Sequence, residues 1–210
     1  MHAFIRSILD ILFPLSPDAG CVRDTKFETL AALCSPHTVG EITVLCSYRA
    51  PRVRAFLHET KFHRNERAIA LLGQLLGEYL NESFPQTVHG KNNRELCLVP
   101  IPLSSKRLRE RGYNQTLLIA RAARVHAPHA QVHEELLKKI RHTPSQTSLS
   151  RAERLSNLDG VFAAGEHALP LDTPLILFDD IVTTGFTLAE AARALRRAGF
   201  TRIARLALAH

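Results

Sequence analysis

The segment Leu-Ile-Leu-Phe-Asp-Asp-Ile-Val-Thr-Thr-Gly-Phe-Thr, residues 175–187, decides the fold of this chain. Its apolar start after Pro174 predicts a buried strand, which delivers two adjacent acids, Asp179 and Asp180, at its carboxyl end. A short loop then opens a helix predicted over residues 188–198, with Gly199 at its C-cap. A strand, a loop and a helix in this order indicate one unit of a parallel α/β sheet.

The same loop has the composition of a phosphate-binding site. Backbone N–H groups at the start of a helix attract phosphate, and Gly185 allows close approach of the backbone. Hydroxyl donors come from Thr183, Thr184 and Thr187. The neighbouring carboxylates would repel phosphate, so we expect them to hold a neutral sugar, directly or through Mg²⁺. The segment therefore predicts a ribose 5-phosphate site; the alternative is an ordinary strand–turn–helix whose acids cap the helix.

Apolar periodicity predicts the elements on either side of this segment. We expect a helix over residues 51–80 with a break at 63–65, a strand at 96–101, a basic loop at 103–112, a helix at 115–125 and a strand at 203–209. Residues 131–140 fit a strand or a helix, and residues 15–50 show too little periodicity for an assignment. The predicted fold is α/β, a parallel sheet flanked by helices.

Length and composition indicate one main domain. The chain has 210 residues, of which 45% are hydrophobic and 22% charged, a balance that excludes a disordered or fibrous protein. We predict a small appendage at residues 1–50 and a core domain at residues 51–210. No apolar run approaches the ~18 residues of a membrane span, and the amino terminus lacks a cleavage signal, so we expect a cytoplasmic protein that binds no membrane.

The positive charge is concentrated in one block of sequence. The chain carries 27 basic and 20 acidic residues, a net charge of +7. Residues 101–157 hold 11 of the basic residues and 4 of the acidic ones, so this block alone accounts for the excess. Such a field favours an anionic partner, either a phosphorylated metabolite or nucleic acid; a solvated basic face is the alternative.

The cysteines predict neither a zinc ribbon nor a redox motif, because no two of them are spaced as CxxC. Without a secretory signal, Cys21, Cys34, Cys46 and Cys97 fit a reducing compartment. A degraded metal site from the first three cysteines and His37 is the alternative. We therefore expect no structural zinc in this protein.

Residues 175–187 also resemble the phosphoribosyl pyrophosphate (PRPP) signature of type I phosphoribosyltransferases: four apolar residues, two acids, two further positions, Thr-Thr-Gly, any residue and Thr. Two other blocks resemble the ComF-like (competence protein F, or GntX-type) branch of that family. They are Val99-Pro-Ile-Pro-Leu-Ser-Ser-Lys-Arg-Leu-Arg-Glu-Arg-Gly-Tyr-Asn-Gln and the stretch from Arg141 to Phe162. Lys61-Phe-His after Tyr48 resembles the start of the family's core domain, so the resemblance covers residues 48–210.

The resemblance implies a type I phosphoribosyltransferase-like sheet and a role for each block. It implies PRPP, or another phosphorylated ribose, as ligand and Mg²⁺ as cofactor, with Asp179 and Asp180 as the catalytic and metal-holding acids, through ribose or water. The 5-phosphate loop would be Thr183, Thr184, Gly185, Phe186 and Thr187. The pyrophosphate loop would contribute Lys106, Arg107 and Arg111, and a closing loop would contribute Arg141, Gln146 and Arg154.

Two functions remain open at this stage. One is transfer of phosphoribosyl to an unidentified acceptor with release of pyrophosphate. The other is a non-catalytic accessory protein of DNA uptake that binds nucleotides or single-stranded DNA. Against a nucleic-acid module, the chain has no Trp and three Tyr, and Tyr113 is the one Phe, Trp or Tyr in the basic block. Dimers are common for this fold, so a homodimer is also open, whereas the usual paired-cysteine zinc modules of ComF-like proteins are lacking.

Overall fold

The computed structural model describes residues 16–85, 96–141 and 160–210. Its centre is a six-stranded sheet in the order β1-β2-β8-β7-β3-β4. The strands are β1 (Cys34–Val39), β2 (Ile42–Cys46), β3 (Leu96–Pro100), β4 (Ala130–Val132), β7 (Leu175–Ile181) and β8 (Ile203–Ala209). Every neighbouring pair is parallel except β1 with β2. The expected α/β fold with a mostly parallel sheet is confirmed.

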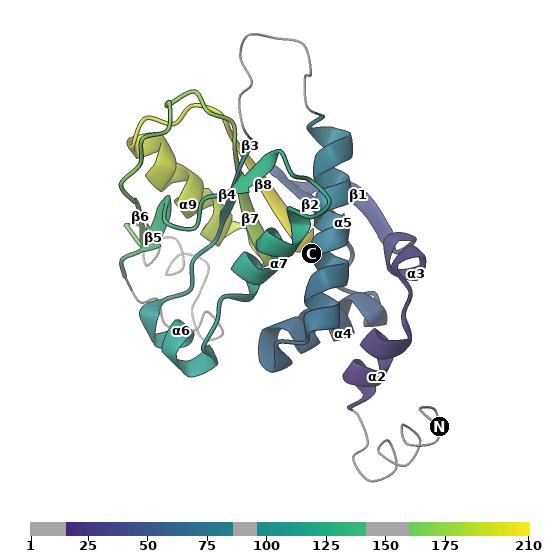
Figure 1. The fold of residues 1–210 in the computed structure, drawn as a ribbon. Coiled ribbons are helices and arrows are strands. Elements are labelled where there is room, and N and C mark those ends of the chain that lie inside the picture. Colours follow the sequence, from purple (N-terminus) through teal and green to yellow (C-terminus); the bar gives the residue numbers. More distant parts are fainter. Residues whose placement is uncertain (1–15, 86–95, 142–159) are drawn as a thin grey trace.

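Helices cover both faces of this sheet (Figure 1). One face carries α4 (Pro51–His63), α5 (Glu66–Ser83) and α7 (Gln115–Ala123), and the other carries α9 (Phe186–Arg197). Smaller elements are α2 (Pro17–Asp24), α3 (Phe27–Ala31), α6 (Ser105–Arg111) and a hairpin of β5 (Leu137–Lys139) with β6 (Phe162–Ala164). The predicted break between the first two long helices is confirmed, since Arg64, the C-cap of α4, has a left-handed φ of 49° and Asn65 caps α5.

The pleat of β7 divides the core into two halves. Ile176 and Phe178 pack in the cluster that contains α5 and α7, whereas Leu175 and Leu177 pack in the cluster that contains α9. Successive side chains of a strand point to opposite faces, so the next two residues of β7 must also separate. The strand therefore aims Asp179 toward the α9 side and Asp180 toward the α7 side.

The basic segment at 103–112 is wrongly predicted as a loop, because residues 105–111 form helix α6. The side chain of Ser104 accepts a hydrogen bond from the backbone N–H of Arg107 at 3.3 Å, which caps the start of the helix. Gly112 ends it with a left-handed φ of 80°. The residues between are good helix formers, but none of them is buried, so no apolar period marks the helix in the sequence.

Residues 131–140, which the sequence leaves open, contain two short strands, β4 and β5. The hairpin of β1 and β2 continues the main sheet through the pairing of β2 with β8. The division of the chain at residue 50 stays a prediction. No helix within 16–85, 96–141 or 160–210 is both long and apolar enough to span a membrane.

The cysteines differ from the expectation of reduced thiols. Cys34 and Cys46 are joined by a disulfide across the β1–β2 hairpin, while Cys21 and Cys97 are free. Antiparallel pairing sets Cys34 opposite Cys46, with Cα atoms 4.5 Å apart. This proximity depends on the hairpin, which was not assigned from the sequence. The alternative metal site from three cysteines and His37 is not assembled, because two of its ligands are bonded to each other.

A candidate phosphate- and sugar-binding site

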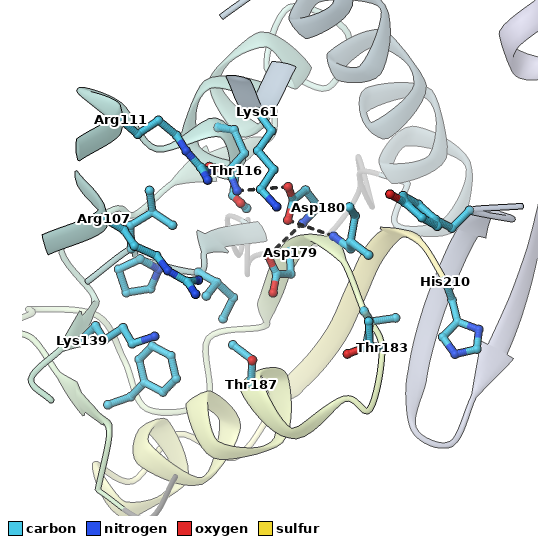
Figure 2. Close-up of a pocket in the computed structure, with 18 residues that line it drawn as sticks. Lys61, Arg107, Arg111, Thr116, Lys139, Asp179, Asp180, Thr183, Thr187 and His210 are labelled. Atoms are coloured by element: carbon cyan, nitrogen blue, oxygen red, sulfur yellow. Dashed lines mark hydrogen bonds between the residues drawn. The ribbon is translucent and has the colours of Figure 1, made fainter. Parts of the chain in front are cut away.

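The carboxyl edge of the sheet carries a cavity of about 660 Å³ (Figure 2). Its walls come from the ends of β3 and β7, from α4, α6, α7 and the β5–β6 hairpin, and from the chain's last residue. The lining residues with charged, amide or hydroxyl groups include Lys61, Arg107, Arg111, Gln115, Thr116, Lys139, Asp179, Asp180, Thr183 and Thr187. The site thus collects residues that lie far apart in the sequence.

Asp180 belongs to a chain of polar side chains that reaches α6. Its Oδ2 accepts a hydrogen bond from Gln115 Nε2 at 3.0 Å, and Arg111 donates in turn to Gln115 Oε1. Only 8% of Asp180 is exposed, and its other oxygen, Oδ1, accepts the backbone N–H of Ile181 at 3.0 Å, so both oxygens have a partner. Gln115 is the first residue of α7, and Asn114 caps that helix by accepting from the N–H of Thr116.

Asp179 has a different environment on the other side of β7. Burial raises its pKa well above the ordinary value of 3.8, and the charge of Asp180 adds to the effect, while Lys139 opposes it. Burial and the nearby Arg107 lower the pKa of Lys139. Lys139 is therefore too weak a partner to compensate the burial of Asp179 and the charge of Asp180.

The loop from Val182 to Thr187 forms the opposite end of the cavity. Gly185 has a φ of 75°, a conformation that favours glycine, and an added Cβ would also displace the end of the Ile42 side chain, whose Cδ1 would lie 2.7 Å away. The chain turns there into α9, a helix of 12 residues. Thr183 and Thr187 line the cavity, whereas Thr184 is exposed and lies outside the lining. Phe186 packs against the α9 core.

Two cations that the sequence did not single out as ligands reach the same cavity. Lys61 projects from the last turn of α4 toward Asp180, and Lys139 projects from β5 on the side of Arg107 (Figure 2). The end of α4 is held in place by Tyr113, whose hydroxyl donates to the carbonyl of Thr60 at 3.1 Å and accepts from the N–H of Arg64 at 3.0 Å. Tyr48 and His210 complete the wall beyond Thr183.

The structure separates the remaining predicted residues. Arg107 and Arg111 line the cavity, but Lys106 lies outside it and faces Glu110 at 3.9 Å on the exposed side of α6. Arg141 is exposed after β5 and is not part of the lining. Gln146 and Arg154, with most of the predicted closing loop, lie outside the described residues. Charge and position along the chain do not distinguish Arg107 from Lys106. Their positions around the axis of α6 decide that Arg107 faces the cavity and Lys106 does not.

Sequence comparisons agree with the ComF-like resemblance. No protein-family model matches the chain. It is 31% identical over 159 residues to the DNA utilization protein YhgH of Escherichia coli K12, covering 71% of this chain and 63% of that protein. It is also 32% identical over 111 residues to competence protein F of Haemophilus influenzae, covering 51% and 47% of the two chains. It is 34% identical over 114 residues to competence protein ComFC of Bacillus subtilis, covering 51% of this chain and 41% of that protein.

These matches support a ComF-like family for the chain. The chain spans less than two thirds of the length of each of these relatives. Their names refer to DNA utilization and to competence and mention no phosphoribosyl chemistry.

Proposed function

We propose that the cavity binds PRPP, or another phosphorylated ribose, together with Mg²⁺, in a protein with a role in DNA uptake or utilization. One observation carries the proposal: two carboxylates of β7 lie between a threonine- and glycine-rich helix start and a wall of cations. A phosphorylated sugar with a second anionic group matches this order: a phosphate for the helix start, sugar hydroxyls for the carboxylates, and a second anion for the cations. The relatives' names support the cellular role.

The helix start of α9 would hold the 5-phosphate. The partial positive charge of a helix N-terminus and its free N–H groups favour an anion there, and the hydroxyls of Thr183 and Thr187 add donors. Each hydrogen bond to a charged group contributes about 1.5–3 kcal/mol. A few such bonds are enough for a dissociation constant on the order of 1 μM.

Asp179 and Asp180 suit the sugar and the metal. Carboxylate oxygens accept hydrogen bonds from ribose hydroxyls and are hard ligands that Mg²⁺ prefers. The raised pKa of Asp179, caused by burial and by Asp180, indicates an unmet need for positive charge at this position. A bound Mg²⁺ would supply that charge and help to neutralise pyrophosphate. The residues present therefore fit the ion.

Arg107, Lys139, Lys61 and Arg111 would face the pyrophosphate of PRPP. In a transfer reaction, the bond between ribose C1 and the pyrophosphate oxygen breaks, the acceptor forms a new bond to C1, and pyrophosphate leaves with the electron pair. Fixed cations stabilise the negative charge that collects on the leaving oxygen. The acceptor would enter a cavity whose far wall is formed by Tyr48 and His210.

Calorimetric titration of PRPP, with and without Mg²⁺, tests the proposal. We expect magnesium-dependent binding on the order of 1 μM by the wild type. Asp179→Asn/Asp180→Asn should lose the dependence on Mg²⁺, because the amide oxygens carry no charge. Arg107→Ala should weaken PRPP more than ribose 5-phosphate, because only PRPP carries the pyrophosphate.

The matched control is Asp172→Asn, which changes an exposed acid outside the cavity and should bind as the wild type does. Absence of binding to a folded wild type, or binding that the double variant retains in full, would overturn the proposal. Transfer itself is read separately, as pyrophosphate released when candidate acceptors are added.

A second candidate function, binding of single-stranded DNA, is favoured by the surface beside the cavity. Lys106, Arg107, Arg109 and Arg111 lie on α6, a helix without a buried residue. Phe62, with 57% of its surface exposed, lies beside this helix, and the guanidinium of Arg111 is 5.8 Å from its ring centre. The fold thus places an exposed aromatic ring, from outside residues 101–157, beside the basic side chains of α6. Basic side chains next to an exposed aromatic ring are typical of proteins that bind single strands.

A further inference from the structure

The carboxyl-terminal part of α4 holds a cluster of metal-binding side chains outside the cavity. His58, Glu59 and His63 each offer a ligand atom, and these atoms all lie within 4.8 Å of one another. From this cluster we propose that the chain binds one Zn²⁺ ion through His58, Glu59 and His63, with Asp18 of α2 as the orienting carboxylate. This site shares no residue with the proposed PRPP site and uses none of the cysteines.

Glu59 is the anchor of the proposed site. Only 3% of its side chain is exposed, although it is a carboxylate near the carboxyl end of a helix, where the helix dipole disfavours negative charge. Its Oε1 accepts from Ser16 Oγ at 3.2 Å and its Oε2 accepts from Asn65 Nδ2 at 3.0 Å. Both donors are neutral, so they orient the carboxylate without compensating its charge.

Within the described part of the chain, the one ion pair recorded for Glu59 is with His63, whose Nε2 lies 3.9 Å from Oε1. Histidine is mostly uncharged at neutral pH unless its surroundings favour the proton. A buried carboxylate is costly unless it is paired with a positive charge. A divalent cation between Glu59 and the two imidazoles would supply that charge permanently.

Asp18 gives His58 the arrangement common for metal-binding imidazoles. Asp18 Oδ2 lies 3.0 Å from His58 Nδ1. A carboxylate at one ring nitrogen favours the proton there and leaves the lone pair of the other nitrogen for a metal. Both histidine rings are about half exposed, with 48% and 54% of the side chain accessible, so an ion can reach them from solvent.

The donor set selects zinc. Two imidazole nitrogens and one carboxylate oxygen form a known zinc ligand combination, with a fourth position left for water. Mg²⁺ and Ca²⁺ prefer oxygen ligands, so they should compete poorly. The groups that build the site come from α2, from α4 and from the cap of α5, three elements that meet in Figure 1. Bound zinc would therefore hold together the helices that support Lys61.

The test uses the full chain without a polyhistidine tag, stripped with a chelator and kept free of reductant, so that the Cys34–Cys46 disulfide stays closed. Zn²⁺ is titrated by calorimetry, and Co²⁺ is titrated as a spectroscopic probe of the ligand geometry. We expect one equivalent of Zn²⁺ with a micromolar or lower dissociation constant, visible cobalt bands, and a rise in the melting temperature with zinc.

Three variants separate the site from chance binding. His63→Ala and Glu59→Gln should lose the stoichiometric equivalent and the cobalt bands; glutamine keeps the shape and the acceptor oxygen of Glu59 without its charge. Asp18→Asn should weaken zinc binding by about tenfold, as expected of an orienting residue. His37→Ala, an exposed histidine in β1, and Cys21→Ser are the controls and should bind zinc as the wild type does.

Equal zinc binding by His63→Ala and the wild type, or no stoichiometric binding at all by a folded wild type, would overturn the proposal. Loss of binding in Cys21→Ser would also overturn it, since a thiolate would then be the ligand. Asp179→Asn/Asp180→Asn should leave zinc binding unchanged, so failure of the PRPP site and failure of the zinc site are distinguishable.

Discussion

At the scale of single residues, the site depends on the opposite fates of two adjacent acids. Asp179 and Asp180 are chemically identical, but alternation along β7 puts them on different faces of the sheet. Asp180 obtains a hydrogen bond from Gln115 at 3.0 Å. The pKa of Asp179 is raised by burial and by Asp180, against a partial opposing effect of Lys139. The fold thus stabilises the carboxylate of Asp180. It disfavours the charged form of Asp179, and a bound cation would relieve that cost.

This cost makes a prediction about stability and pH. A raised folded-state pKa means that the native state holds a proton which the unfolded state has released, so stability falls as pH rises from about 4 through the folded-state pKa of Asp179. Asp179→Asn removes this loss. We expect the variant to be more stable than the wild type at pH 7–8, by about 1.4 kcal/mol for each unit of pKa elevation.

The gain should shrink as pH is lowered toward about 4, the ordinary pKa of the unfolded carboxyl, because below this pH the carboxyl is protonated in both states. Urea unfolding of both proteins between pH 4 and 8 measures the difference. The amide of asparagine can still accept the backbone N–H of Asp180, now bonded to Asp179 Oδ1 at 2.9 Å, so no hydrogen bond need be lost. A variant less stable than the wild type at pH 7–8 contradicts the argument.

At the scale of elements, the helices on the cavity side are placed by close contact between α5 and α7. Gly73 and Gly77 face α7 so closely that an added Cβ would lie 2.4 Å from Ala122 Cβ and 2.7 Å from the carbonyl oxygen of Ala123. This approach fixes α7, whose first residue is Gln115, against the sheet. The partner of Asp180 therefore depends on two glycines about 40 residues earlier in the chain.

We predict opposite effects of one substitution at two helices. Alanine in place of glycine favours a helix interior by about 1 kcal/mol. Gly77→Ala, however, must displace backbone of α7, and overpacking of this kind costs about 1–3 kcal/mol or more, so the variant should be destabilised. Gly20→Ala in α2 has no atom within 4 Å of the added Cβ and should be stabilised. Thermal unfolding of the two variants compares them directly.

Equal stability of Gly77→Ala and the wild type would show that α7 moves freely relative to α5. In that case the hydrogen bond between Gln115 and Asp180 would also be insensitive to the substitution. A destabilised Gly77→Ala with weakened PRPP binding is the expected result, because the two helices position the site together.

The same scale shows what the sequence could predict. The strands β3, β7 and β8 and the helices α4, α5, α7 and α9 follow from apolar periodicity, because each buries a face. Helix α6 buries nothing, so its character is visible only in its caps, Ser104 and Gly112. The short strands β4 and β5, of three residues each, are too brief for a period to appear.

The predicted parts of the site are those contained in one contiguous segment. Asp179, Asp180 and the threonine loop could be identified because strand, acids and helix start follow one another in residues 175–187. Lys61 and Lys139 could not, since each reaches the cavity from a distant element and nothing local distinguishes it from other lysines. Gln115 could not be identified either, because its bond to Asp180 depends on the packing of α7 against the sheet.

At the scale of the whole molecule, the basic residues of α6 face two different surroundings. Arg107 and Arg111 point into the cavity, whereas Lys106 and Arg109 do not line it. The division separates small-ligand binding from any binding of nucleic acid on the outside of α6. The two proposed functions can therefore be tested on different residues of the same seven-residue helix.

We predict that Lys106→Ala/Arg109→Ala weakens single-stranded DNA without affecting PRPP. Contacts to a single-stranded backbone make the logarithm of affinity fall with the logarithm of salt concentration, with a slope of about −0.7 for each phosphate neutralised. Loss of two contacts should reduce the steepness by about 1.4. Fluorescence anisotropy of a labelled oligonucleotide across a salt series measures the slope, and calorimetry with PRPP measures the cavity.

The matched control is Arg196→Ala/Arg202→Ala, which removes two exposed arginines from the last turn of α9 and from the segment before β8, away from α6 and Phe62. It lowers the net charge by the same amount, so a general effect of charge would weaken DNA equally in both double variants. An effect confined to the α6 variant would assign the DNA surface to this helix.

Phe62→Ala should then weaken DNA binding without changing the salt slope, because stacking of a base on the ring is insensitive to salt. Equal salt slopes for the wild type and the α6 variant would show that α6 is not part of a DNA surface. The proposed role of α6 would then be limited to the cavity.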